Sequence, residues 1–151
     1  MKYVVIDLQP TGYWLDPEPY LGVLPELAAK LPPGARAFAE APEHYDFSHV
    51  ECVKDLWLQS IEHTDDAATL AFTANKWKHD RDLTLTYSGV VEVTFEGQRQ
   101  VCTDARFGSL MLDELLPTDT GFTHEFMLTS GIVKITARDL TAEWIAFDDT
   151  V

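Results

Sequence analysis

Residues 82–97 read DLTLTYSGVVEVTFEG and constrain the fold more than any other part of the chain. The odd positions from Leu83 to Phe95 are all apolar except Gly89, and six of the seven even positions from 84 to 96 are Thr, Ser or Glu. This alternation predicts β-structure with one face in a core and the other toward solvent. The stretch therefore builds a core, and its outer face carries no visible chemistry.

Two geometries of this stretch compete. A tight hairpin with a Ser88-Gly89 turn would place Leu85 opposite Glu92, so that an apolar face met a polar one, which the pleat of a sheet forbids. A three-residue loop restores the matching, but such loops need glycine at their last position and here it lies in the middle. A continuous strand bent at Gly89 keeps every odd residue on one side. We therefore expect a bent strand, which lets a sheet curl over its own core.

Short segments rich in β-branched and aromatic residues predict further strands. We expect them at 2–9, 50–53, 56–63, 69–75, 101–103, 122–129, 132–137 and 140–147. The apolar positions change parity between Leu58 and Ile61, which predicts a β-bulge near Gln59 and Ser60. Residues 109–116 are ambiguous between strand and helix.

The N-terminal part has a different character. Prolines and a glycine over residues 10–20 predict a loop, with Trp14 and Tyr20 folded back as a cover. Residues 25–31 predict a short helix and residues 34–41 another helical turn. The expected fold is α+β and mostly β, a curved antiparallel sheet or open β-barrel with one or two short N-terminal helices. Residues 1–151 form one domain, in which 10–47 cap the antiparallel part at 48–147.

The charge balance bears on partners. The chain has 25 acidic and 11 basic residues, a formal net charge of −14. Such a surface repels phosphate backbones and anionic membranes, so we expect no nucleic-acid and no membrane partner, whereas a basic protein would be attracted. Solubility alone also accounts for the charge. No segment approaches the length of a membrane helix and no signal-peptide core is present, which predicts a cytoplasmic protein.

Signatures of catalysis and cofactor binding are absent from the sequence. It contains no GxSxG, GxxxxGK[ST], GxGxxG, HExxH, CxxC or EF-hand loop. Cys52 and Cys102 are expected to be buried thiols. We therefore assign no catalytic residue and no cofactor, and an enzyme with a scattered site stays the alternative.

Histidines supply the remaining chemical candidates. In EHYDFSH, residues 43–49, the side chains of His44, Asp46 and His49 could share a metal, but their spacing matches no metal motif. The preferred interpretation is a turn in which Asp46 and Ser48 bond to the backbone. His124 shares a predicted strand face with three apolar residues, which favours a satisfied core residue over a catalytic one.

An acidic band is the predicted interaction surface. From Glu40 to Asp66 there are eight acidic residues and one base, Lys54. A basic partner would meet five of these acids: Glu51, Asp55, Glu62, Asp65 and Asp66. The local basic cluster of Lys76, Lys78 and Arg81 is expected to pair with acids nearby.

Four segments together carry a resemblance: HYDFSHVECVKDLWLQSIEH, LTLTYSGVVEVTF, LMLDELL and FTHEFMLTSG. Over residues 44–147 the chain resembles small bacterial β-rich domains of unknown function, some of which are encoded beside toxins and are immunity-like. The resemblance implies a mostly antiparallel sheet and transfers no functional residue.

These observations favour a non-enzymatic binding protein, of the immunity or antitoxin type, that uses its acidic face against a basic partner. The alternative is a small-molecule-binding or enzymatic β-barrel. Its site would lie near His124, near residues 44–49 or near the four tryptophans, Trp14, Trp57, Trp77 and Trp144.

Overall fold

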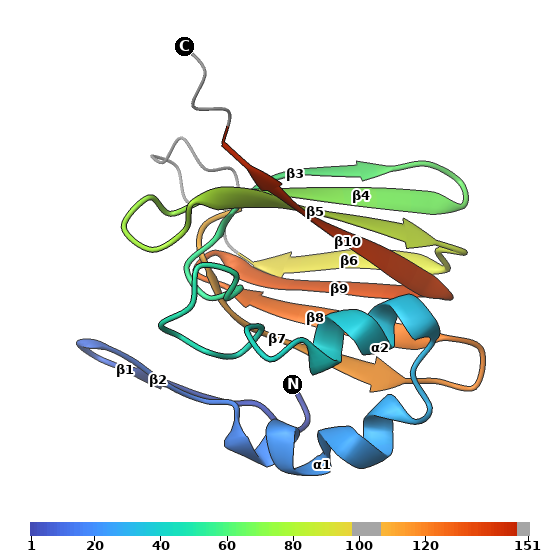
Figure 1. Cartoon of the computed structure of the whole chain (residues 1–151), viewed down its shortest axis with the longest axis horizontal. Helices are drawn as coiled ribbons and strands as arrows, with labels where there is room; N and C mark the ends of the chain where they lie inside the picture. Colours follow the sequence, from blue (N-terminus) through green and yellow to red (C-terminus); the bar gives the residue numbers. More distant parts are fainter. Residues whose placement is uncertain (98–106, 148–151) are drawn as a thin grey trace.

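The computed structural model describes residues 1–97 and 107–147. Their elements are β1 (Val5–Gln9), β2 (Gly12–Asp16), α1 (Glu18–Ala28), α2 (Pro33–Glu40), β3 (Trp57–His63), β4 (Ala67–Thr73), β5 (Arg81–Ser88), β6 (Glu92–Gly97), β7 (Leu110–Pro117), β8 (Phe122–Leu128), β9 (Gly131–Ala137) and β10 (Asp139–Ala146). The strands form three antiparallel sheets: the hairpin β1-β2 and two four-stranded sheets, ordered β10-β5-β4-β3 and β6-β9-β8-β7 (Figure 1). The predicted class, α+β and mostly β, is confirmed, and the sheets described here do not close into a barrel.

The hydrophobic core lies between the two four-stranded sheets. Phe72 of β4 meets Phe126 of β8 with ring centroids 5.6 Å apart, and Tyr87 of β5 stacks on Phe122 of β8 at 6.2 Å. The predicted alternation of β5 holds, since Leu83, Leu85 and Tyr87 are all buried. The prediction is wrong beyond Gly89, where the strand is interrupted at residues 89–91, Val91 is 75% and Phe95 38% exposed, and the even residue Val90 is buried instead.

The chain passes from one four-stranded sheet to the other twice at the same corner, between β5 and β6 and between β9 and β10. β5 pairs with β4 and β10, whereas β6 pairs with β9, so the hairpin alternatives for residues 82–97 are excluded. The chain bends at Gly89, whose φ is +60°, and β9 and β10 are separated there by Arg138 alone. A Cβ on Gly89 would lie 2.7 Å from the Arg138 side chain, so the corner requires glycine for both its φ and its contact.

Other strand predictions had mixed outcomes. The bulge is confirmed, because the β3–β4 register shifts between Leu58 and Ser60. The ambiguous segment 109–116 is the strand β7, which is buried on both faces. The predicted strand at 50–53 is wrong: Cys52 N–H bonds to His49 O at 3.2 Å, as in a turn. The predicted strand at 101–103, with Cys102, lies outside the described residues.

The N-terminal part contains more regular structure than predicted. Residues 12–16 are β2 and not loop, and α1 begins at Glu18, before the predicted start at Pro25. Tyr20 is buried as expected, but Trp14 is 66% exposed and covers nothing. At the start of α2 the Asp139 carboxylate of β10 accepts the N–H groups of Gly34 and Ala35 at 3.2 and 2.9 Å, so a neighbouring strand caps this helix. Neither α1 nor α2 has the length and apolar character of a membrane-spanning helix.

Candidate functional site

The five acids predicted to form one surface fall into two groups. Glu51 accepts a hydrogen bond from Arg81 at 2.7 Å, and Asp55 pairs with Lys54 at 2.9 Å and Lys78 at 3.4 Å. The predicted local pairing of Lys78 and Arg81 is therefore confirmed. Glu51 and Asp55 are partly shielded and already neutralised, which removes them from a surface that could attract a basic partner.

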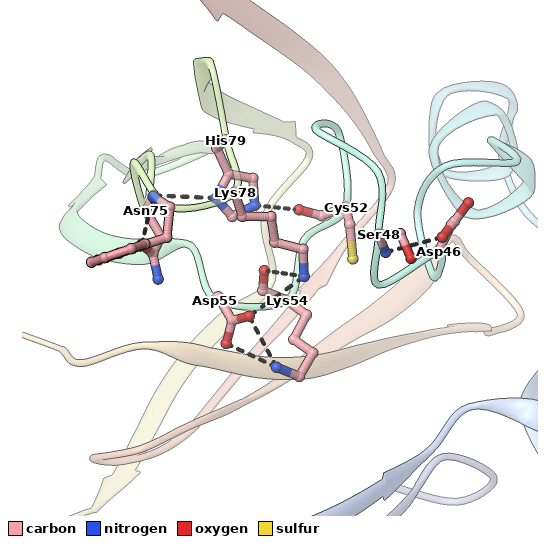
Figure 2. A network of polar contacts seen from close by, with 9 residues as sticks. Asp46, Ser48, Cys52, Lys54, Asp55, Asn75, Lys78 and His79 are labelled. Carbon is pink, nitrogen blue, oxygen red and sulfur yellow. Dashed lines mark hydrogen bonds and ion pairs between the residues drawn. The ribbon is translucent and has the colours of Figure 1, made fainter.

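Figure 2 shows the loops in which Asp55 lies. Asp55 has φ of +77°, a conformation uncommon for a residue with a side chain, and its N–H bonds to Leu110 O at 2.8 Å. The Lys54 and Lys78 ammonium groups both approach its carboxylate and both lie over the Phe47 ring, at 5.7 and 5.9 Å from the centroid. Asp55 thus anchors this loop to the β7 region through its backbone and holds two lysines through its side chain.

Two further contacts in Figure 2 join the same loops. His79 Nε2 lies 2.7 Å from Cys52 O, and His79 Nδ1 accepts a hydrogen bond from the Asn75 N–H at 3.1 Å. Because Nε2 must donate to a carbonyl while Nδ1 accepts, the ring is neutral, and its burial lowers the pKa of His79. The Cys52 thiol is buried as predicted, and burial raises its pKa. The predicted turn is also confirmed, since the Asp46 carboxylate accepts the Ser48 N–H at 3.0 Å.

Glu62, Asp65 and Asp66 form the second group, which we name the acidic tip. They lie at the end of β3 and in the turn before β4, and all three are exposed. None has an ion pair within residues 1–97 and 107–147. The Val90 N–H donates to Asp66 O at 3.0 Å, which brings the acidic tip beside the corner where exposed Glu92 begins β6. The carboxylates of the acidic tip therefore lie exposed at the end of the β3–β4 hairpin, which a backbone hydrogen bond joins to the corner.

The deepest polar group in the protein is a cluster that sequence reasoning did not assemble. We name it the buried cluster: His44, Tyr87, Asp113 and His124, of which the most exposed, His44, has 2% of its surface accessible. The two carboxylate oxygens of Asp113 have different partners. Oδ1 lies 2.7 Å from His44 Nε2, and Oδ2 lies 2.6 Å from His124 Nε2. The Tyr87 hydroxyl donates to His124 Nδ1 at 2.7 Å. The loop after α2 and strand β8 thus meet at the Asp113 carboxylate of β7, and Tyr87 of the other sheet joins them through His124.

Hydrogen-bond roles fix the charges in the buried cluster. His44 Nδ1 lies 2.9 Å from Phe38 O, and His44 Nε2 faces the Asp113 carboxylate. Because both partners can only accept hydrogen bonds, both ring nitrogens donate and the ring is cationic. Burial lowers the pKa of His124, which favours the neutral ring, so its Nε2 donates to Asp113 and its Nδ1 accepts a hydrogen bond from the Tyr87 hydroxyl. Burial alone would raise the pKa of Asp113, but the positive charge of His44 and the bonds from both rings hold it well below its ordinary value. The buried cluster is one ion pair with a neutral imidazole, and its net charge is zero.

This arrangement stabilises a core and offers no place for a reactant. All four ring nitrogens have partners, and no buried side-chain N or O atom of the described residues lacks one. The preferred interpretation of His124 as a satisfied core residue is confirmed. The metal alternative for residues 43–49 finds no support: His44 turns inward, Asp46 is exposed, and His49 Nδ1 accepts the Glu51 N–H. No metal-binding group of three or more such side chains occurs in the described part of the chain.

Glu114, next to Asp113 on β7, faces the opposite side of the strand. Its carboxylate accepts the backbone N–H groups of Lys2, Tyr3 and Val4, each at 2.7 Å. Three successive N–H groups around one anion form an anion-binding nest. Glu114 therefore fixes the segment from which β1 departs.

The tryptophans lie on four separate elements. Trp14 is on β2, Trp57 on β3, Trp144 on β10, and Trp77 in the loop before β5, where it is 98% exposed. Trp14 and Trp77 face solvent, so the predicted cavity lined by tryptophans is not supported by their positions.

A scan against protein-family models gives no match for this chain, and a search of curated protein sequences gives none either. Any assignment of function therefore depends on the chemistry of the chain's own surfaces.

Proposed function

We propose that the protein is a non-enzymatic binding protein whose acidic tip engages a basic partner protein. The observation that supports this function most directly is the availability of Glu62, Asp65 and Asp66, which are exposed and have no ion pair within the described residues. The neighbouring acids Glu51 and Asp55 are matched by bases. Carboxylates that do not stabilise the fold through ion pairs are the ones that can meet an external cation.

The net charge of −14 extends this argument from one site to the whole molecule. An acidic surface accelerates association with a basic protein and disfavours acidic competitors. A nuclease toxin is basic because it must hold nucleic acid, so an acidic immunity-type inhibitor in a bacterial cytoplasm is a physically coherent role. The resemblance over residues 44–147 agrees with that role.

The test is an affinity measurement across a salt series. The tagged protein captures its partner at low salt, and the captured basic protein is then titrated against wild type and the double variant D65N/D66N. We expect the variant to bind roughly tenfold more weakly and to lose part of the salt dependence. The matched control E26Q/D119N removes two exposed charges elsewhere and should bind like wild type.

Equal affinities for wild type and D65N/D66N would exclude the acidic tip as the contact surface. Binding that is insensitive to salt would contradict the electrostatic basis of the proposal as a whole.

A further inference from the structure

The hairpin formed by β1 and β2 leaves the body of the protein and ends in solvent (Figure 1). Ile6 and Leu15, at its base, pack partly against the core. Beyond them Leu8 is 67% exposed and Trp14 66% exposed. An isolated two-stranded hairpin is marginally stable in water. The exposed side chains of Leu8 and Trp14 do not pack in the core and so do not stabilise it. Their placement is typical of an interaction surface.

One face of the hairpin combines an aromatic ring with a carboxylate. In the β1–β2 register Asp7 lies directly opposite Trp14, and Val5 opposite Asp16. Asp7 and Trp14 also line a shallow, open groove of about 440 Å³ at this end of the hairpin, together with Gln9, Thr11, Gly12 and Tyr13. The Asp7 carboxylate accepts one bond from the Gln9 side chain at 2.9 Å and has no ion pair in the described part of the chain.

The charge around this groove has one sign. Between Lys2 and Lys30 the sequence contains no lysine or arginine, while it contains Asp7, Asp16, Glu18 and Glu26. A guanidinium group is the side chain that satisfies an indole face and a carboxylate at once, because it stacks on aromatic rings and forms charge-assisted hydrogen bonds. Both strands of the hairpin also keep a free edge, since in the described residues each pairs only with the other. A free edge accepts an extended peptide through main-chain hydrogen bonds.

We propose that the β1-β2 hairpin is a docking arm for an extended, arginine-bearing segment of a protein, with the guanidinium held between the Asp7 carboxylate and the Trp14 ring. The segment adds to one edge of the hairpin and lays its apolar side chains along the exposed leucine and aromatic residues. This site is separate from the acidic tip, which lies at the β3–β4 turn, and it does not depend on the function proposed for that tip.

The probe is a fluorescein-labelled peptide of alternating arginine and valine, with a peptide of alternating glutamate and valine as its counterpart. Binding is followed by fluorescence anisotropy at about 100 mM salt, where exposed charges still interact. We expect wild type to bind the arginine peptide and not the glutamate peptide. Trp14→Ala and Asp7→Asn should each weaken binding about five- to tenfold.

Trp77→Ala is the matched control, because Trp77 is even more exposed but lies on the loop before β5. It should bind the arginine peptide like wild type, as should D65N/D66N. Failure of wild type to bind at ~1 mM peptide would overturn the proposal, and so would equal losses in W14A and W77A. A dimer seen by light scattering in wild type and abolished by W14A would assign the arm to a second copy of the chain and would also overturn it.

Failure of this test leaves the proposed function intact, because that function is measured through D65N/D66N and the natural partner. Equal partner binding by wild type and D65N/D66N would likewise leave the peptide result unchanged.

Discussion

The buried cluster and the acidic tip contain the same kind of chemistry in opposite environments. In the buried cluster the Asp113 carboxylate has two imidazole partners and is inaccessible to water. In the acidic tip three carboxylates are exposed and form no ion pair with any residue of 1–97 or 107–147. A buried charge is tolerated only with a partner, and an exposed one needs none. The first group is therefore required for the fold, and the second is available for binding.

The comparison also shows how a cluster of catalytic appearance can be structural. A histidine between a carboxylate and a hydroxyl is a familiar catalytic arrangement, but here Tyr87 and Asp113 occupy both nitrogens of His124 inside a dry core. Accessibility to a substrate, and not the identity of the residues, distinguishes a catalytic cluster from a structural one. The following substitutions test that separation from the largest expected effect to the smallest.

Asp113→Ala should produce the largest loss. It leaves the buried His44 cation without its partner, which costs about 3–5 kcal/mol in the free energy of unfolding. Urea denaturation followed by circular dichroism measures this loss. The exposed turn residue Asp119, changed to Ala, should have an effect below about 0.5 kcal/mol. A loss under about 1 kcal/mol in D113A would mean that the buried ion pair does not hold the loop after α2 to β7.

Glu114→Ala should have the next largest effect. It removes the acceptor of three backbone N–H groups in residues 2–4, and we expect a loss of about 2–3 kcal/mol. Hydrogen exchange should show faster exchange of the amides of Lys2 to Val4. Glu143→Ala, an exposed acid on β10, serves as the control and should leave exchange in residues 2–4 unchanged.

Tyr87→Phe should cost about 1–2 kcal/mol, because it deletes only the hydroxyl that donates to His124 Nδ1 and leaves that acceptor unpaired. Tyr13→Phe, on the hairpin, removes an exposed hydroxyl and should leave the urea midpoint unchanged. Equal stability of Y87F and wild type would show that the bond to His124 contributes nothing net.

Acid should weaken the protein in two stages. The pKa values of His124 and His79 are lowered from 6.5 in the folded state, so the unfolded chain binds more protons as pH falls below about 6.5 and stability declines. The pKa of Asp113 is lowered from 3.8, so its contribution is present above that pH and is lost below it. Urea midpoints measured between about pH 7.5 and pH 3 should fall in this order. A midpoint that stays constant between about pH 4 and pH 3 would contradict the lowered pKa of Asp113.

The acidic tip should show the smallest effect on stability. D65N/D66N should unfold within about 0.5 kcal/mol of wild type, since neither carboxylate has a partner within the described residues. A larger loss would reveal a structural role and would remove the contrast between the two regions.

Periodicity predicted the elements whose environment is one-sided. β4, β5, β8 and β9 alternate between core and surface, and each was located from its sequence to within a few residues. β7 was ambiguous because it is buried on both faces, by the core and by the N-terminal segment held at Glu114. A strand without alternation carries no periodic signal. β2 was missed because its flanking prolines and Gly12 resemble a loop.

The sites were predictable only in part. The acidic band was predicted from a run of charge. Its division into paired and free acids depends on Lys78, in the loop before β5, and on Arg81, the first residue of β5. The buried cluster could not be predicted, since His44 and Asp113 are 69 positions apart, and Asp113 and His124 meet only through the register of β7 and β8. His124 and its apolar neighbours were the only signal.

The corner at Gly89 and Arg138 governs the order in which the protein can assemble during synthesis. The meander β3-β4-β5 can pair as soon as it leaves the ribosome, but β6 finds its partner only when β9 has been made, and β5 acquires its second neighbour only with β10. Until β8 has been made, the apolar row of Leu83, Leu85 and Tyr87 has no opposite layer to cover it, because Phe122 of β8 is the ring that stacks on Tyr87. We therefore expect an incomplete chain to expose this apolar row, and truncation before β8 should yield insoluble protein.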